Sequence, residues 1–119
     1  HNSGNKDKAI DFFERALDHN PEDYWPNFNL GNTLFYKDPK RSRLYLNKAY
    51  DLNPSEPCIN ILLGRLDLCE GKEAEAKEKF QIAYDRYEQR WKANSLNNSD
   101  YGWFASVAEE LGKKDKVMK

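Results

Sequence analysis

An internal repeat of 33 to 34 residues governs how this chain can fold. Pro21 and Pro54 are 33 residues apart, and the Leu-Gly pairs that end at Gly31 and Gly64 keep the same separation. Two further series follow steps of 33 and then 34 residues: Phe13, Leu46 and Phe80, and Ala16, Ala49 and Ala83. A fixed period of this length indicates that one supersecondary unit recurs along the chain.

Each repeat is predicted to form two helices. Apolar residues recur at helical spacing, as in Ala76, Phe80 and Ala83, and the alternation typical of strands is absent. Asn53-Pro54 should end a helix, because a residue before proline is disfavoured in the α region. We expect helices over 6–19, 22–36, 40–52, 56–69, 72–93 and 101–111, with turns at Gly4, 37–39 and Gly71 and the start of another helix over 113–119.

Two glycines stand where a helix interior is expected. Gly31 and Gly64 each cost about 1 kcal/mol relative to alanine at such a position. That cost predicts a second helix crossing close to the backbone, with Leu46 and Phe80 filling the space beside the glycines.

These residues resemble the tetratricopeptide repeat (TPR) family. Its pattern has a Leu-Gly pair in the first helix, a glycine at the turn, an alanine, an aromatic and a second alanine in the second helix, and a closing proline. The sequence from Leu63-Gly64 through Gly71, Ala76, Phe80 and Ala83 matches this pattern closely. The preceding repeat matches with one residue deleted in the turn and with Ser42 at the first alanine. The resemblance implies an all-α, right-handed solenoid of antiparallel helix pairs with an atypical C-terminal helix.

The repeat boundaries predict a single TPR-like domain over residues 1–119. Residues 1–21 are the second half of a repeat, 22–54 a repeat, 55–95 a repeat with an extended second helix, and 99–119 a capping or partial repeat. The helix over 6–19 is expected to expose Ile10, Phe13 and Leu17, which further residues before His1 or a second chain would cover. The last helix is expected to fold back on Tyr84, Tyr87 and Trp91, with a self-association surface as the alternative.

Composition excludes several classes of function. The 119 residues carry 19 Lys and Arg against 20 Asp and Glu, a net charge of -1 that argues against nucleic acid as a partner. The apolar runs are far too short for membrane insertion. The two cysteines should be reduced, which favours the cytoplasm without establishing the compartment.

No sequence motif indicates catalysis. The chain has no phosphate loop, no Gly-x-Ser-x-Gly elbow and no His-Glu-x-x-His helix, so we expect no enzyme, no cofactor and no metal site. Asp67 stands on a face that should be packed. We expect it to form a structural ion pair across the repeat boundary or to turn to solvent.

The resemblance places a peptide-binding groove along the first helices of the repeats. It would be lined by Trp25, Phe28, Asn32, Phe35 and Tyr36, with Ile61 and Arg65 one repeat further on. Trp25, Phe28 and Phe35 would bury apolar side chains of a partner, while Asn32 and Arg65 would bind its backbone or a carboxylate. The alternative is that Trp25, Phe28 and Ile61 only pack between repeats.

The predicted function is therefore protein binding. The chain would act as a scaffold or adaptor that holds a protein or peptide in a concave aromatic groove. The alternative is an oligomerisation or spacer segment of a longer protein that self-associates through the solenoid ends.

Overall fold

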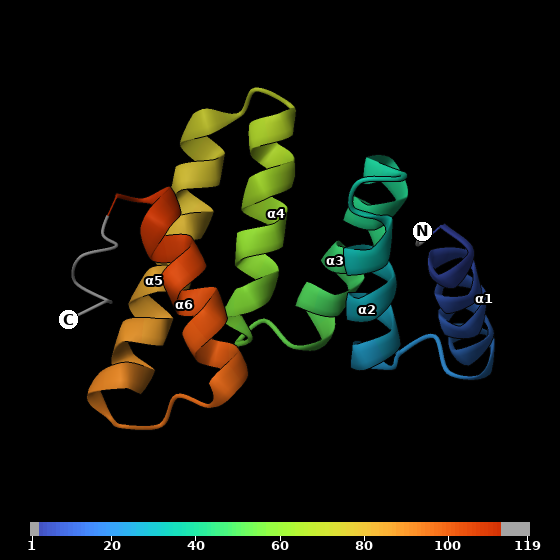
Figure 1. Cartoon of the computed structure of the whole chain (residues 1–119), viewed down its shortest axis with the longest axis horizontal. Coiled ribbons are helices and arrows are strands. Elements are labelled where there is room, and N and C mark those ends of the chain that lie inside the picture. The colour runs from blue at the N-terminus through green and yellow to red at the C-terminus, as the bar shows by residue number, and fades with distance from the viewer. Residues whose placement is uncertain (1–2, 113–119) are drawn as a thin grey trace. The chain divides into compact units, whose positions relative to one another are not determined.

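The computed structural model describes residues 3–112 and is entirely helical in its regular structure, with no strand in that range. Figure 1 shows the six helices of these residues in chain order: α1 (Ser3–His19), α2 (Tyr24–Leu34), α3 (Pro39–Leu52), α4 (Pro57–Cys69), α5 (Glu73–Lys92) and α6 (Asn98–Glu110). The all-α prediction is confirmed, whereas the start of a helix expected over 113–119 lies outside the described residues. The chain divides into two compact units, His1–Ile59 and Asn60–Lys119.

The first unit is centred on the α2–α3 pair. The Asp38 carboxylate accepts a hydrogen bond from the Arg41 amide at 3.3 Å, and Pro39 occupies the first helical position. These two residues fix the start of α3. A Cβ on Gly31 would lie 2.6 Å from Leu46 Cγ, which confirms the predicted close crossing at this glycine. The Ser42 hydroxyl donates a buried 2.6 Å hydrogen bond to the Gly31 carbonyl, a second link between α2 and α3.

Helix α1 packs against α2. Ile10 belongs to the same buried cluster as Leu30 and Leu34, and Phe13 and Leu17 are partly buried against that cluster. The expectation that all three α1 side chains need cover from outside the chain is therefore wrong for Ile10, because α2 covers it. The large apolar side chain that α1 does expose is Phe12, at 67% of its surface.

The second unit repeats the glycine contact between α4 and α5. A Cβ on Gly64 would lie 2.7 Å from Phe80 Cε1, as the sequence predicted for this glycine. Gly71 ends α4 with φ +78°, where the Lys72 amide donates to the Asp67 carbonyl at 2.8 Å. The Asp67 side chain is buried and ion-pairs with Lys79 of α5, within the same helix pair rather than across a repeat boundary.

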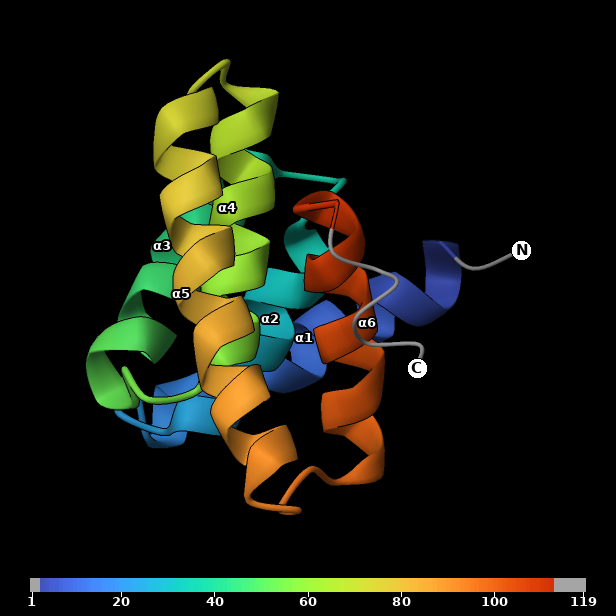
Figure 2. The same cartoon turned by 90° about the vertical axis from the view of Figure 1, so that its left-hand side faces the viewer.

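Helix α6 covers the aromatic side of α5. Figure 2 shows α5 and α6 joined by the loop at their lower ends. The Phe104 ring lies 5.3 Å from Tyr84 and 6.0 Å from Tyr87, and all three side chains are buried in one cluster. The predicted fold-back of the last helix is confirmed for these residues, while Trp91 stays partly exposed.

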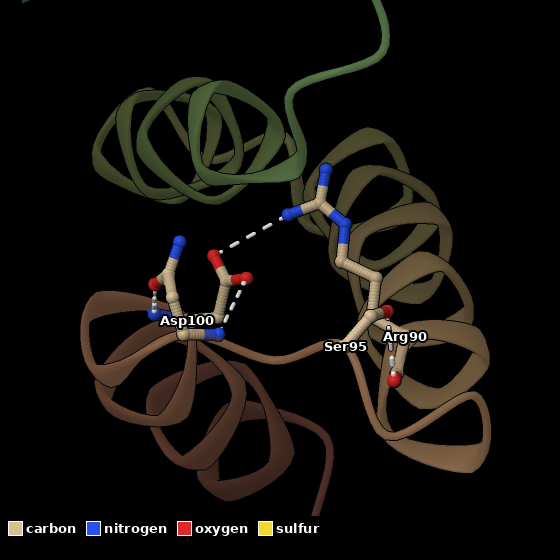
Figure 3. A network of polar contacts seen from close by, with 4 residues as sticks. Arg90, Ser95 and Asp100 are labelled. Atoms are coloured by element: carbon tan, nitrogen blue, oxygen red, sulfur yellow. Dashed lines mark hydrogen bonds and ion pairs between the residues drawn. The ribbon is translucent and has the colours of Figure 1, made fainter.

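Polar contacts fix the junction between α5 and α6. Asn94 adopts a left-handed φ of 56°, and the Ser95 amide then donates to the Arg90 carbonyl at 2.8 Å. The Asn97 side chain accepts from the Asp100 amide at 2.8 Å, and Asp100 accepts in return from the Asn97 amide. Figure 3 shows Arg90 reaching Asp100, with 3.3 Å between Arg90 Nη1 and Asp100 Oδ1. These contacts start α6 three residues earlier than the sequence predicted.

The described helices do not meet the requirements for a membrane-spanning segment. None of those between residues 3 and 112 combines the length and the apolar character needed to cross a bilayer.

Candidate functional site

Helix α2 and the turn after it carry five of the seven predicted site residues. Trp25, Asn32 and Tyr36 are exposed, and Tyr36 keeps 85% of its surface accessible. Phe28 and Phe35 are buried, with 7% and 8% exposed. A partner that approaches this helix therefore meets Trp25, Asn32 and Tyr36 first. The buried ring of Phe28 contacts Trp25, and the buried ring of Phe35 contacts Tyr36.

The aromatic residues at the start of α2 form one packed group. The Phe28 ring stacks on Tyr24 at a centroid distance of 6.0 Å and an angle of 11°, and it meets Trp25 edge to face at 6.0 Å. Such contacts fix ring orientation and add about 0.5–1.5 kcal/mol each beyond the buried area. Phe28 thus packs as the structural alternative expects, whereas Trp25 sits at the surface with 59% exposed.

The Tyr24 hydroxyl below this group is buried. Burial raises the pKa of Tyr24 above its ordinary value, and the neighbouring Cys58 and Glu56 act in the same direction. The phenol therefore stays protonated at neutral pH.

Ile61 and Arg65 belong to the second unit. Ile61 is fully buried in the cluster that α4, α5 and α6 share, so it offers no surface to a ligand. Arg65 is partly buried and its Nη2 donates to Ser106 Oγ of α6. In this unit, Ile61 and Arg65 therefore both contact other helices of the same chain.

A pocket of about 400 Å³ lies between α1 and α2 in the first unit. We call it the α1/α2 pocket, and its walls are Asn5, Lys6, Ala9, Asn32, Thr33 and Tyr36. Two of the predicted site residues, Asn32 and Tyr36, are therefore brought together at one concavity. Sequence reasoning missed the three α1 residues of the pocket, Asn5, Lys6 and Ala9. For Ala9 the sequence offered a signal, because the repeat spacing relates it to Ser42 and Ala76.

Two ion pairs join α1 to the residues that follow α2. Lys37 of the α2–α3 turn pairs with Asp7, and Arg41 of α3 pairs with Glu14 at 2.6 Å. The Arg41 guanidinium donates a hydrogen bond to the Tyr45 hydroxyl, which raises the pKa of Arg41, and Glu14 adds to the effect. The α1/α2 pocket itself presents two amides, two hydroxyls, one ammonium and an aromatic ring, groups that can hydrogen-bond to a polypeptide or pack against it.

A second pocket of about 310 Å³ lies at the other end of α1. Its lining is Leu17, Pro21, Asn27, Leu44, Tyr45 and Lys48. Lys48 is already paired with Glu22 at 2.6 Å, and Asn27 donates to the Pro21 and Asp23 carbonyls, so its polar groups are used inside the unit.

Metal-ligating residues do not gather anywhere between residues 3 and 112. No group of three or more His, Cys, Asp or Glu side chains in that part of the chain could hold a metal ion. Cys58, which is buried, and Cys69, which is exposed, form no disulfide.

The sequence was compared with known proteins in two ways. A scan against models of protein families found no match, and a search of curated proteins found no similar sequence.

Proposed function

We propose that this chain is a protein-interaction module of TPR-like helix pairs whose α1/α2 pocket binds a segment of a partner polypeptide. The repeated glycine contact, Gly31 against Leu46 and Gly64 against Phe80, supports the proposed stacking of equivalent pairs into a right-handed solenoid. A scaffold or adaptor role is part of this proposal.

One observation carries the binding proposal. Tyr36 projects from the surface beside a pocket of about 400 Å³ and is 85% exposed. A rigid aromatic ring provides large contact area at low entropic cost, and the neighbouring Asn32 amide can pair with a peptide backbone. Trp25 at the other end of α2 would extend the contact along the same helix.

Selection from a random peptide display library on the immobilised chain tests this proposal. The affinity of the selected peptides is then measured by fluorescence anisotropy for the parent, for Tyr36→Ala and for Asn32→Ala. We expect Tyr36→Ala to weaken binding by about tenfold or more, since truncating an interface aromatic costs about 1–2 kcal/mol.

Tyr101→Ala is the matched control. It removes a half-exposed tyrosine of α6, in the other unit, and should leave the affinity unchanged. The proposal fails if no peptide is enriched, or if Tyr101→Ala weakens binding as much as Tyr36→Ala does.

A second candidate function is self-association through the ends of the repeat array. The observation that favours it is the exposure of Phe12 on α1, because an exposed aromatic on an end helix favours pairing. Sedimentation at several concentrations tests it: the mass should rise with concentration in the parent and stay monomeric in Phe12→Lys. A constant monomer mass in the parent would exclude this candidate.

A further inference from the structure

A second concavity of the first unit lies apart from the α1/α2 pocket. It is the pocket of about 310 Å³ between the end of α1, the α1–α2 turn and α3, and we call it the Leu44 pocket. Its walls lie between residues 17 and 48, all within the first unit and away from both ends of the described range. It shares no lining residue with the α1/α2 pocket.

The polar groups of the Leu44 pocket are bound inside the unit. Lys48 pairs with Glu22, and the Asn27 amide donates to two backbone carbonyls. The Tyr45 hydroxyl accepts a hydrogen bond from Arg41. The remaining walls are apolar and come from Leu17, Pro21, Leu44 and the ring of Tyr45. A hollow of this kind fits an apolar side chain.

Leu44 departs from the repeat at the rim of this pocket. The repeat spacing relates it to Asp11 in α1 and to Glu78 in α5, and both of these carboxylates are exposed. Leu44 keeps 69% of its surface exposed, so this position faces solvent in all three helices. An exposed leucine where the equivalent residues are charged, beside an apolar pocket, is typical of a contact surface.

The charges around Leu44 indicate which partner fits. Helix α3 has four basic residues and one acidic residue, and three of the basic residues lie one helical turn from Leu44: Lys40, Arg41 and Lys48. Arg41 and Lys48 are paired with glutamates of the same unit. No acidic side chain between residues 3 and 112 pairs with Lys40, which is exposed. An acidic group of a partner can therefore pair with Lys40.

We propose that the Leu44 pocket binds an acidic partner polypeptide that inserts one large apolar side chain and places an aspartate or glutamate beside Lys40. The apolar side chain would cover Leu44 and pack against Leu17 and Tyr45. The carboxylate would add selectivity more than affinity, because an ion pair at an exposed lysine contributes little free energy. This site does not depend on binding at the α1/α2 pocket.

A second copy of the chain fits this surface less well than an acidic partner does. Pairing two copies through α3 would bring their basic residues together, and like charges across an interface oppose association. We therefore assign the pocket to a different polypeptide, and self-association is one outcome of the test.

Selection from a random peptide display library on the Tyr36→Ala chain tests this inference, because that variant weakens the α1/α2 pocket. The enriched peptides are dye-labelled and titrated into the parent and its variants by fluorescence anisotropy. We expect them to share a large apolar residue and an acidic residue. Leu44→Glu should weaken their binding by about tenfold or more. This variant should stay folded, since α5 has Glu78 at the equivalent position, and circular dichroism checks the fold.

Reversing the charge tests the role of the acidic residue. Replacing it by lysine in the peptide should weaken binding to the parent, whereas the Lys40→Glu chain should prefer the lysine peptide. Phe12→Glu is the matched control, because it makes the same kind of change at an exposed apolar residue of the first unit outside the pocket. It should leave the affinities unchanged.

The inference is overturned if no peptide is enriched on the Tyr36→Ala chain, or if Lys40→Glu leaves the charge preference as it was. It is also overturned if Phe12→Glu weakens binding as much as Leu44→Glu does. A concentration-dependent dimer that Leu44→Glu abolishes would identify a second copy as the occupant and overturn it as well. The proposed function is judged by its dependence on Tyr36, so the two proposals can fail separately.

Discussion

At the residue scale, the most informative residues are two glycines, which carry no side chain. Gly31 and Gly64 lie in helix interiors where alanine is intrinsically better, and both backbones approach a large side chain of the paired helix. The sequence could predict this because an unfavourable residue that recurs at the repeat period needs a packing reason. Gly102 is also helical, yet its Cβ position is open, so it has no such reason.

Replacing each of these three glycines by alanine should separate the effect of packing on the free energy of unfolding from the effect of helix propensity. Gly31→Ala and Gly64→Ala should each lower the free energy of unfolding by about 1–2 kcal/mol, since overpacking exceeds the gain in helix propensity. Gly102→Ala should raise it by about 0.5–1 kcal/mol. Urea unfolding measures all three, and stabilisation by Gly31→Ala would show that the helices do not cross as closely as described.

Other residues of the candidate site could not be placed from the sequence. Helix α2 is apolar on nearly every side, so its periodicity does not distinguish the buried Phe28 and Phe35 from the exposed Trp25. Asn5 and Lys6 carry no apolar signal at all, and only the packing of α1 on α2 brings them to the pocket. Composition and spacing therefore indicated the helix that carries the site but not the side chains that reach its surface.

At the element scale, side-chain caps fix where α3 and α6 begin. The first helices of both full repeats start later than predicted, and α6 starts earlier because Asn97 and Asp100 form a capping box. The expectation about α1 was wrong for Ile10, because α2, the next helix along the chain, covers that side chain.

The buried ion pair between α4 and α5 should be replaceable by the residues at the equivalent positions of the first unit, Leu34 and Tyr45. Lys79→Tyr alone should destabilise the chain by about 3 kcal/mol, because it removes the cation that pairs with the buried Asp67 carboxylate. Asp67→Leu combined with Lys79→Tyr copies Leu34 and Tyr45 and should restore most of that stability. Thermal unfolding of the single and double variants measures the coupling, and additive losses would contradict the equivalence of the two helix pairs.

At the scale of the whole molecule, the repeat predicted the helix order and the glycine contacts of both pairs. Each unit adds one helix to its pair: α1 packs on α2 in the first unit, and α6 packs on α5 in the second. The fold could be anticipated to this extent because each repeat uses the same few residues for the same contacts. The candidate binding surface could not, because the α1/α2 pocket depends on how α1 packs on α2.

Amide chemical-shift mapping of the isotope-labelled chain tests the central claim of polypeptide binding at the α1/α2 pocket most directly. The tightest library-selected peptide is titrated until the shifts saturate. The account predicts saturable changes concentrated at Ala9, Asn32, Thr33 and Tyr36, with α6 unaffected. Saturable changes confined to α6, or no saturable change anywhere, would contradict it.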